Sequence, residues 1–184
     1  KVIVDDFEGA YKIVSHMIEM GCKRIAHLGT EEDLIIGKNR KSGYIKALKD
    51  HGLSIDEKLI VKCDTHSAAR VVTKRLVYEL NPPDGIFAVN DITAIGALQT
   101  VKECNLRIPE DICIAGFGNG LYSEFTDPPI TTVEQNGYKM GQKAMNLLLD
   151  RLIRKDDYPP ITEVLETGLV IRKSTQRPTT MQYI

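Results

Sequence analysis

Small polar residues follow short apolar runs at three places in the chain, where they could bind a ligand. Asn90 and Asp91 end the apolar run 85–89, and similar residues end the segments 107–119 and 130–135. Ligand sites in open α/β sheets form where strands stop, so these side chains are candidates for one site. The Asn90 amide can both donate to and accept from a hydroxyl. The simplest role of Asp91 is to cap a helix that begins there.

Arg40 lies near the start of an expected helix, where a positive charge is mildly unfavourable for the helix dipole. Its guanidinium could point into a cleft and hold two ligand oxygens at once. A solvated surface charge explains the same position, and the sequence leaves both interpretations open. If Arg40 lines an open cleft, replacing it with Ala should weaken ligand binding by roughly 1.5–3 kcal/mol and leave folding nearly intact.

Other patterns that could perform chemistry lack the context that they need. The glycines at 116, 118 and 120 resemble a phosphate loop, but Pro128 and Pro129 leave too little room for the long helix such a loop requires. The four histidines lack metal-ligand spacing, and no serine nucleophile motif is present. Asp5, Asp6, Asp56 and Glu57 are most simply solvated carboxylates. We therefore expect no cofactor, no metal and no catalysis.

The composition of the chain bears on its size, on DNA binding and on the cellular compartment. The 184 residues are 42% hydrophobic, enough for a substantial core, and the net charge of −1 provides no basic surplus for holding DNA. The four cysteines show no C-x-x-C spacing, which favours free thiols in a reducing compartment. No apolar run approaches the roughly 20 residues of a membrane span. The chain begins without Met in a strand-like run, and we interpret it as a fragment.

Strand-like and helix-like segments alternate, which predicts an α/β fold with mostly parallel strands covered by helices. The expected strands cover residues 2–4, 24–28, 59–62, 85–89, 112–115, 131–133 and 162–171, and the expected helices cover residues 8–20, 39–51, 67–80, 92–104 and 138–153. Gly21 and Gly52 should end two helices, and Ser67 should cap a third. The helix 138–153 should pack its apolar stripe, and the polar residues from Thr175 onward should fray.

Several short segments of the chain, taken together in their order, resemble those of a known protein family. They are Gly9-Ala-Tyr11, Gly21-Cys-Lys-Arg-Ile-Ala-His-Leu-Gly29, Arg40-Lys-Ser-Gly-Tyr44, Pro83-Asp-Gly-Ile-Phe-Ala-Val-Asn-Asp91, Ile108-Pro-Glu-Asp-Ile112, Thr131-Thr-Val-Glu-Gln135, Met140-Gly141 and Leu169-Val-Ile-Arg-Lys-Ser-Thr175. Together they resemble the effector-binding domain of the lactose-repressor and galactose-repressor (LacI/GalR) family of bacterial transcription regulators. The resemblance covers nearly the whole chain.

The resemblance implies a two-lobe fold like that of periplasmic sugar-binding proteins, with a ligand cleft between the lobes. One lobe would comprise approximately residues 1–22 and 134–160, and the other approximately residues 23–133 and 161–175, with a tail at 176–184. The first part of one lobe, a hinge and a helix-turn-helix would precede residue 1, so one lobe would be incomplete at its N-terminal part.

The resemblance also assigns the site. Residues matching Arg40, Asn90 and Asp91 line the effector cleft in the family, and Thr65, Phe117 and Asn119 match positions that often face it. The family commonly has an aspartate where this chain has Gly118. The loss of that acceptor suggests an effector with an acid or phosphate group, or with fewer hydroxyls than a neutral hexose.

The function implied by the resemblance is a ligand-sensing and dimerisation domain of a cytoplasmic transcription regulator. A small effector (a sugar, sugar phosphate or sugar acid) would allosterically control operator DNA binding by the N-terminal domain that this chain lacks. A homodimer would form through the helices 39–51 and 67–80, and no membrane contact is expected. The alternative is a secreted periplasmic solute-binding protein for sugar uptake.

Overall fold

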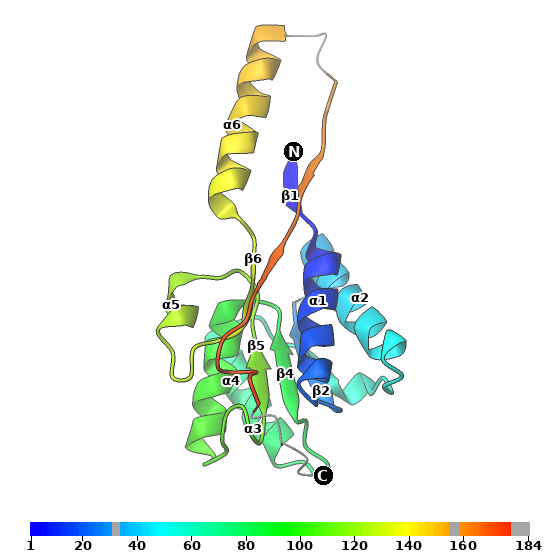
Figure 1. The fold of residues 1–184 in the computed structure, drawn as a ribbon, viewed down its shortest axis with the longest axis vertical. Helices are drawn as coiled ribbons and strands as arrows, with labels where there is room; N and C mark the ends of the chain where they lie inside the picture. Colours follow the sequence, from blue (N-terminus) through cyan, green and yellow to red (C-terminus); the bar gives the residue numbers. More distant parts are fainter. Residues whose placement is uncertain (31–33, 155–158, 178–184) are drawn as a thin grey trace, which may run out of the picture.

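A parallel four-stranded sheet forms the centre of the computed structural model, which describes residues 1–30, 34–154 and 159–177 (Figure 1). Its strands are β2 (Ile25–Gly29), β3 (Ile60–Lys62), β4 (Gly85–Ala88) and β5 (Cys113–Ala115), in the order β3-β2-β4-β5. Register pairs Ala26 with Ile86 and Ile86 with Ile114. The expected α/β class with parallel strands and flanking helices is confirmed.

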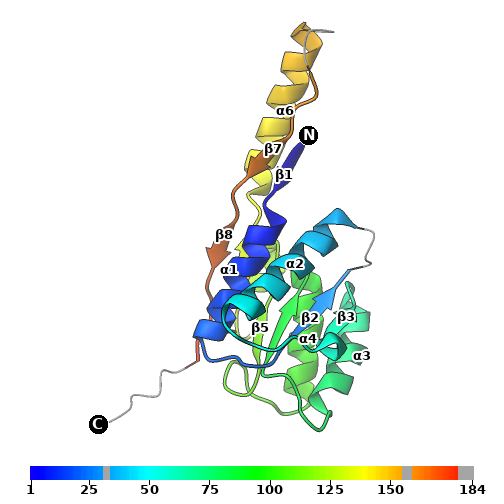
Figure 2. The same ribbon diagram turned by 90° about the vertical axis from the view of Figure 1, so that its right-hand side faces the viewer.

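Two pairs of helices cover the two faces of this sheet. Helices α1 (Asp6–Glu19) and α2 (Ile35–Asp50) pack on one face, and α3 (His66–Val77) and α4 (Asp91–Glu103) pack on the other (Figures 1 and 2). Strands β2, β4 and β5 are fully buried, as expected for mostly apolar strands covered by helices on both sides, and His27 in β2 is buried with them. Gly43 lets α2 approach α1 closely, since a Cβ there would collide with the Phe7 carbonyl oxygen.

Local signals set the ends of these helices. Asp5 caps α1, because its side chain accepts from the Glu8 N–H at 2.9 Å. Gly21 (φ +92°) and Gly52 (φ +71°) follow the ends of α1 and α2 in the left-handed region, as expected. The expected cap at Ser67 was wrong: Thr65 accepts the capping bond from the Ala68 N–H, so the cap of α3 lies two residues earlier.

The remaining elements extend away from the central sheet. Strand β6 (Thr132–Glu134) continues beside β5 through isolated bridges and pairs antiparallel with β8 (Gly168–Val170). Strand β1 (Val2–Val4) pairs parallel with β7 (Glu163–Leu165), and α6 (Gly137–Arg154) packs on β1 (Figures 1 and 2). The short elements are the 3-10 helix η1 (Glu57–Leu59) and helix α5 (Leu121–Glu124).

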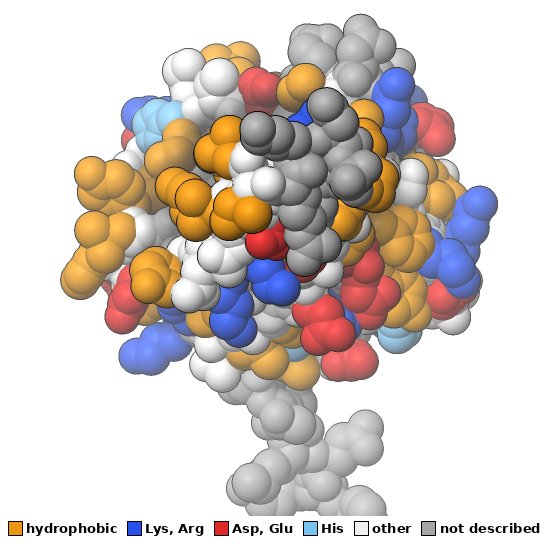
Figure 3. Space-filling model, turned by 90° about the horizontal axis from the view of Figure 1, so that it is seen from above, with side chains coloured by type: hydrophobic (Ala, Val, Ile, Leu, Met, Phe, Trp, Pro, Cys, Tyr) orange, Lys and Arg blue, Asp and Glu red, His pale blue; other side chains and the backbone are white. Residues whose placement is uncertain are grey.

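The apolar stripe of α6 is only partly packed, contrary to expectation. Leu148, Leu149 and Leu152 are 51%, 48% and 64% exposed, although Leu147 and Leu148 line a pocket against β1 and Pro160. Hydrophobic side chains are prominent in the view along this end of the molecule (Figure 3). A stripe at helical spacing identifies a contact face, but it does not show that the partner belongs to the same chain.

The expected fraying from Thr175 onward was also wrong for the described part of that segment. Ser174 and Thr175 are fully buried, and the Thr175 hydroxyl lies 2.9 Å from His16 Nε2. Arg177 donates to the Asp84 carbonyl at 2.8 Å. Residues 178–184 lie outside the described residues.

The contacts group the segments differently from the expected lobe ranges. Helix α1 packs against α2 on the central sheet, whereas β7 pairs with β1 at the other end of the molecule. The division into two lobes stays a prediction.

Candidate ligand-binding site at the strand ends

The sequence-predicted site residues follow the four strands of the central sheet. Arg40 lies in α2 after β2, and Thr65 caps α3 after β3. Asn90 and Asp91 follow β4, and residues 117–119 follow β5. Carboxyl ends of parallel strands share one edge, so the topology places all of these segments at the same end of the sheet.

Arg40 is buried, although the sequence suggested the surface of an open cleft. Arg40 is 5% exposed, and its Nε and Nη2 donate to Asp6 Oδ1 at 2.8 and 2.6 Å. Nη1 donates to the Val89 carbonyl. The Arg40 Cζ lies 3.6 Å from the centre of the Phe117 ring, so the guanidinium stacks on that aromatic face. Burial lowers the pKa of Arg40, and the nearby Asp6 carboxylate opposes this shift.

Asp6 is therefore a partner of Arg40, and its assignment to a solvated surface was wrong. The residue is 6% exposed at the first position of α1. Two neighbouring aspartates at a helix start give no sequence signal that separates their roles. Asp5 is the cap of α1, and Asp6 points inward to the guanidinium.

Asp91 supplies a second buried carboxylate near Arg40. Its Oδ1 accepts from the Thr132 hydroxyl at 2.6 Å, and its Oδ2 accepts from the Gly120 N–H at 2.7 Å. Desolvation by burial raises the pKa of Asp91, and the hydrogen bonds from Thr132 and Gly120 act in the opposite direction. Gly116 is required here, since a Cβ at that position would collide with Asp91 Oδ1.

Gly118 lies beside the same carboxylate in a conformation that side chains rarely adopt. Its φ is +131°, and a Cβ built there would lie 3.6 Å from Asp91 Oδ2. The family's aspartate could not be placed on this backbone without strain. The glycine therefore leaves space next to Asp91.

Asn90 and Thr65 serve as helix caps. Asn90 Oδ1 accepts from the Thr93 N–H at 2.8 Å and caps α4, so the expected cap at Asp91 was one residue late. Asn90 Nδ2 donates to the Asp64 carbonyl at 3.1 Å, which ties the start of α4 to the start of α3.

Asn119 belongs to a polar network that joins β5, β6 and the end of β8. Its Nδ2 donates to Glu134 Oε2 at 2.6 Å, and its Oδ1 accepts from Arg172 Nη2 at 2.8 Å. Arg172 also donates to the Ile130 carbonyl at 3.0 Å. Sequence reasoning did not single out Thr132, Glu134 or Arg172, although each lies in or beside a segment that carried the family resemblance.

Together these groups offer both donors and acceptors to a ligand. Arg40 makes three hydrogen bonds, so two of its five N–H groups remain for other acceptors. The Asp91 carboxylate accepts from the Thr132 hydroxyl and from the backbone of Gly120 and Phe117, and it retains acceptor capacity for one further donor. Hydroxyl groups can satisfy both sets, and the Phe117 ring provides an apolar surface beside them.

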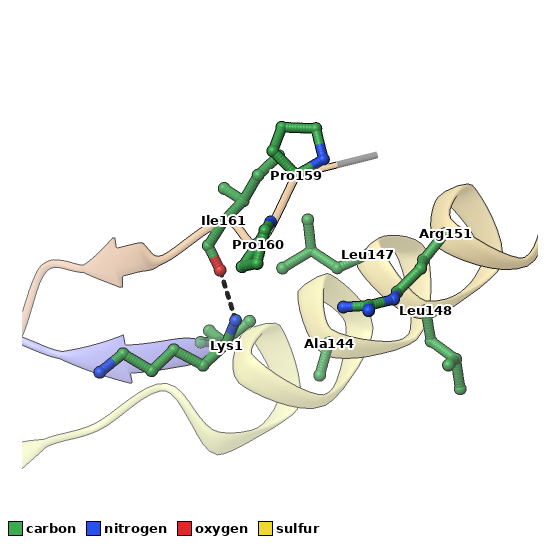
Figure 4. Close-up of a pocket in the computed structure, with 9 residues that line it drawn as sticks. Lys1, Ala144, Leu147, Leu148, Arg151, Pro159, Pro160 and Ile161 are labelled. Carbon is green, nitrogen blue, oxygen red and sulfur yellow. Dashed lines mark hydrogen bonds between the residues drawn. The ribbon is translucent and has the colours of Figure 1, made fainter. Parts of the chain in front are cut away.

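Hollows also lie along the elements that extend from the sheet. A pocket of about 240 Å³ between α6, the start of β1 and the segment 159–161 is lined by Leu147, Leu148 and Pro160 (Figure 4). Another, of about 490 Å³, lies between Asn136 and the turn linking β7 to β8. Among the described residues, no helix has the length and apolarity to cross a membrane, and no three metal-binding side chains cluster.

The comparisons with known proteins agree with this fold. The family model described as a periplasmic binding protein-like domain matches residues 14–175. The HTH-type transcriptional repressor CytR of Escherichia coli (strain K12) is 34% identical over 176 residues, which are 95% of this chain and 51% of the repressor. The HTH-type transcriptional regulator CelR of Thermobifida fusca is 32% identical over 174 residues, 94% of this chain and 51% of the regulator.

Solved structures give the same result. A transcriptional regulator CelR–cellobiose complex has a TM-score of 0.88 at 31% identity, covering 94% of this chain and 53% of that one. A regulatory protein of the LacI family from Chloroflexus aggregans has a TM-score of 0.87 at 30% identity, covering 94% and 62%. The chain spans about half the length of the curated relatives it matches. The chain belongs to the family of periplasmic binding protein-like domains, as the LacI/GalR type of effector domain.

Proposed function

We propose that this chain is the sensor of a cytoplasmic, non-enzymatic transcription regulator and that it binds a small hydroxylated effector at the Arg40–Asp91 cluster. The observation that carries the proposal is that Asp91 retains acceptor capacity and Arg40 retains two N–H groups at the same sheet edge. The relatives named above are regulators, which favours this function over that of a secreted uptake protein.

The burial of Arg40 changes the expected effector chemistry. An accessible, unpaired guanidinium would favour a sugar acid or a sugar phosphate. Here Asp6 already offsets the Arg40 charge, and the Asp91 carboxylate adds negative charge nearby. We therefore favour a neutral sugar-like ligand over an acid, and the space beside Gly118 leaves room for it next to Asp91. The CelR relative in the solved complex binds cellobiose.

Thermal-shift screening tests the effector class. Neutral mono- and disaccharides, sugar phosphates and sugar acids should be compared at matched concentration and ionic strength. We expect the largest rise in melting temperature with a neutral member. Stabilisation by sugar acids or phosphates alone would contradict the charge argument, and stabilisation by none of the three classes would contradict the proposed sensor function.

We further propose that control of operator DNA is exerted through a separate DNA-binding domain and through a homodimer. The net charge of −1 gives this chain no basic surplus for DNA, and the relatives CytR and CelR are named as HTH-type regulators. Effector binding would change the relative orientation of the lobes and thereby the spacing of the paired DNA-binding domains.

Exposed apolar side chains on α3 and α5 support a dimer. Val71 on α3 and Tyr78 at its C-terminal end are 73% and 71% exposed, and Tyr122 on α5 is 68% exposed. Sedimentation velocity should show a concentration-dependent dimer that Tyr78→Glu weakens. A chain that stays monomeric at high concentration would contradict this part of the proposal.

A further inference from the structure

A second pocket lies beside α2, where Lys38 and Lys41 form part of its wall. It has a volume of about 170 Å³ and shares no lining residue with the Arg40–Asp91 cluster. Its walls come from β2, α2, η1 and β3, and its lining includes His27, Gly29, Lys38, Lys41 and Glu57. At about 30 Å³ per water in the liquid, this volume corresponds to about five or six waters, so the pocket suits a molecule smaller than a disaccharide.

His27 provides an unpartnered buried nitrogen at this pocket. The residue is fully buried, and its ring stacks between Tyr44 and Phe87 at centroid distances of 5.2 and 5.0 Å. Nδ1 lies 3.2 Å from the Phe87 carbonyl oxygen, which can only accept, so Nδ1 carries the proton. Nε2 has no hydrogen-bond partner in the structure. A buried acceptor of this kind is costly unless something donates to it.

Gly29 keeps the Nε2 atom accessible from the pocket. A Cβ at position 29 would lie 3.0 Å from His27 Nε2, where it would occupy the space that a donor needs. Both residues line the pocket. Burial lowers the pKa of His27 to about 4, so the ring is neutral at pH 7 and Nε2 acts as an acceptor.

Two lysines of α2 give the pocket its positive charge. Lys38 and Lys41 are three residues apart on one face of the helix, and the Lys41 charge is close enough to lower the pKa of His27. Lys38 lies near the N-terminus of α2, where a cation is unfavourable, and the first turn has no acidic residue to offset it. Glu57 is the acidic member of the lining. Thr30 and Lys62 also line the pocket but have other interactions, so we assign them no role.

We propose that this pocket is a second ligand site, which binds a small hydroxy acid or its phosphate ester. A ligand hydroxyl would donate to His27 Nε2, and the anionic group would lie between Lys38 and Lys41. This combination of one neutral acceptor and two ammonium groups does not suit a neutral sugar. The site could therefore report a second metabolite to the same domain, independently of the Arg40–Asp91 cluster.

The test uses the full chain labelled with ¹⁵N, and the readout is the ¹⁵N shift of His27 Nε2 in long-range ¹H–¹⁵N spectra. D-glycerate, D-3-phosphoglycerate and inorganic phosphate are the probes. We expect D-glycerate or D-3-phosphoglycerate to move the Nε2 resonance upfield in a saturable way, with phosphate alone leaving it in place. The Lys41→Gln variant should bind the same probe at least tenfold more weakly. Lys49→Gln, on the same helix but outside the pocket, should bind like the parent.

Two results would overturn the proposal. One is the absence of any saturable shift of His27 Nε2 with all three probes. The other is equal affinity of the parent and Lys41→Gln. Gly29→Ala provides an independent check, because its Cβ should block access to Nε2 and abolish the shift while the cluster around Asp91 is untouched. A negative result at this pocket would leave the proposed sensor function intact, because the effector screen tests binding at the Arg40–Asp91 cluster.

Discussion

Removing one partner of the buried Asp6–Arg40 pair should destabilise the fold strongly. The two side chains are 7% and 6% exposed, and the shortest distance between their charged atoms is 2.6 Å. Breaking a buried pair by deleting one partner costs about 3–5 kcal/mol, because the remaining charge stays buried without compensation. We therefore expect Asp6→Ala and Arg40→Ala each to lower the free energy of unfolding by about that amount. This replaces the expectation from sequence that Arg40→Ala leaves folding nearly intact.

A double-mutant cycle isolates the pairing from other losses. The double variant leaves no unpaired charge, so its cost should be smaller than the sum of the single costs by about 2–3 kcal/mol. Urea denaturation followed by far-ultraviolet circular dichroism at pH 7 gives the required free energies. Glu8→Ala is the matched control, since Glu8 forms an exposed pair with Lys12 at 3.4 Å on the same helix. It should cost less than about 1 kcal/mol. Single costs near the control value, or additive costs, would refute the reasoning.

Three further predictions concern stability and association. Because the folded-state pKa of His27 is about 4 and the reference value is 6.5, the unfolded chain binds the extra proton between these values. The free energy of unfolding should therefore fall by about 2 kcal/mol between pH 7.5 and pH 5 through this group, and His27→Phe should flatten that dependence in urea titrations. Gly43→Ala should lower the melting temperature, because the added Cβ would collide with α1. Gly141→Ala should stabilise α6 by up to about 1 kcal/mol, because a Cβ there meets nothing within 4 Å. Equal shifts of the melting temperature in the two variants would contradict the packing argument. Replacing Leu148 and Leu152 with Gln should barely change the unfolding free energy of this chain but reduce its aggregation in light scattering, and a loss above about 2 kcal/mol would show that the stripe is packed.

The sequence predicted the order of the elements because local signals fix them. Short, mostly apolar runs became the buried strands, with His27 as a polar member of β2, and Gly21 and Gly52 ended helices through backbone conformations that side chains disfavour. Caps were less predictable, since any of several neighbouring polar residues can accept the same N–H bonds. The structure assigns this role to Thr65 instead of Ser67 and to Asn90 instead of Asp91.

The candidate site was predictable in location but not in charge pairing. Strand ends placed Asn90, Asp91 and Phe117 correctly at one sheet edge, as the parallel topology requires. The Asp6–Arg40 pair joins positions 34 residues apart on two helices, and no local pattern indicates such a contact. The open face of α6 was missed for a related reason, because periodicity reports an apolar stripe whether or not the chain itself covers it.

Calorimetric titration of the strongest neutral sugar from the thermal screen, against the parent and Asp91→Asn, tests the central claim most directly. Asp91 is the carboxylate with free acceptor positions, so its replacement should weaken binding by at least tenfold. Glu103→Gln, at the exposed far end of the same helix, should leave the affinity unchanged. Equal affinity of the parent and Asp91→Asn for the sugar would contradict effector binding at this cluster.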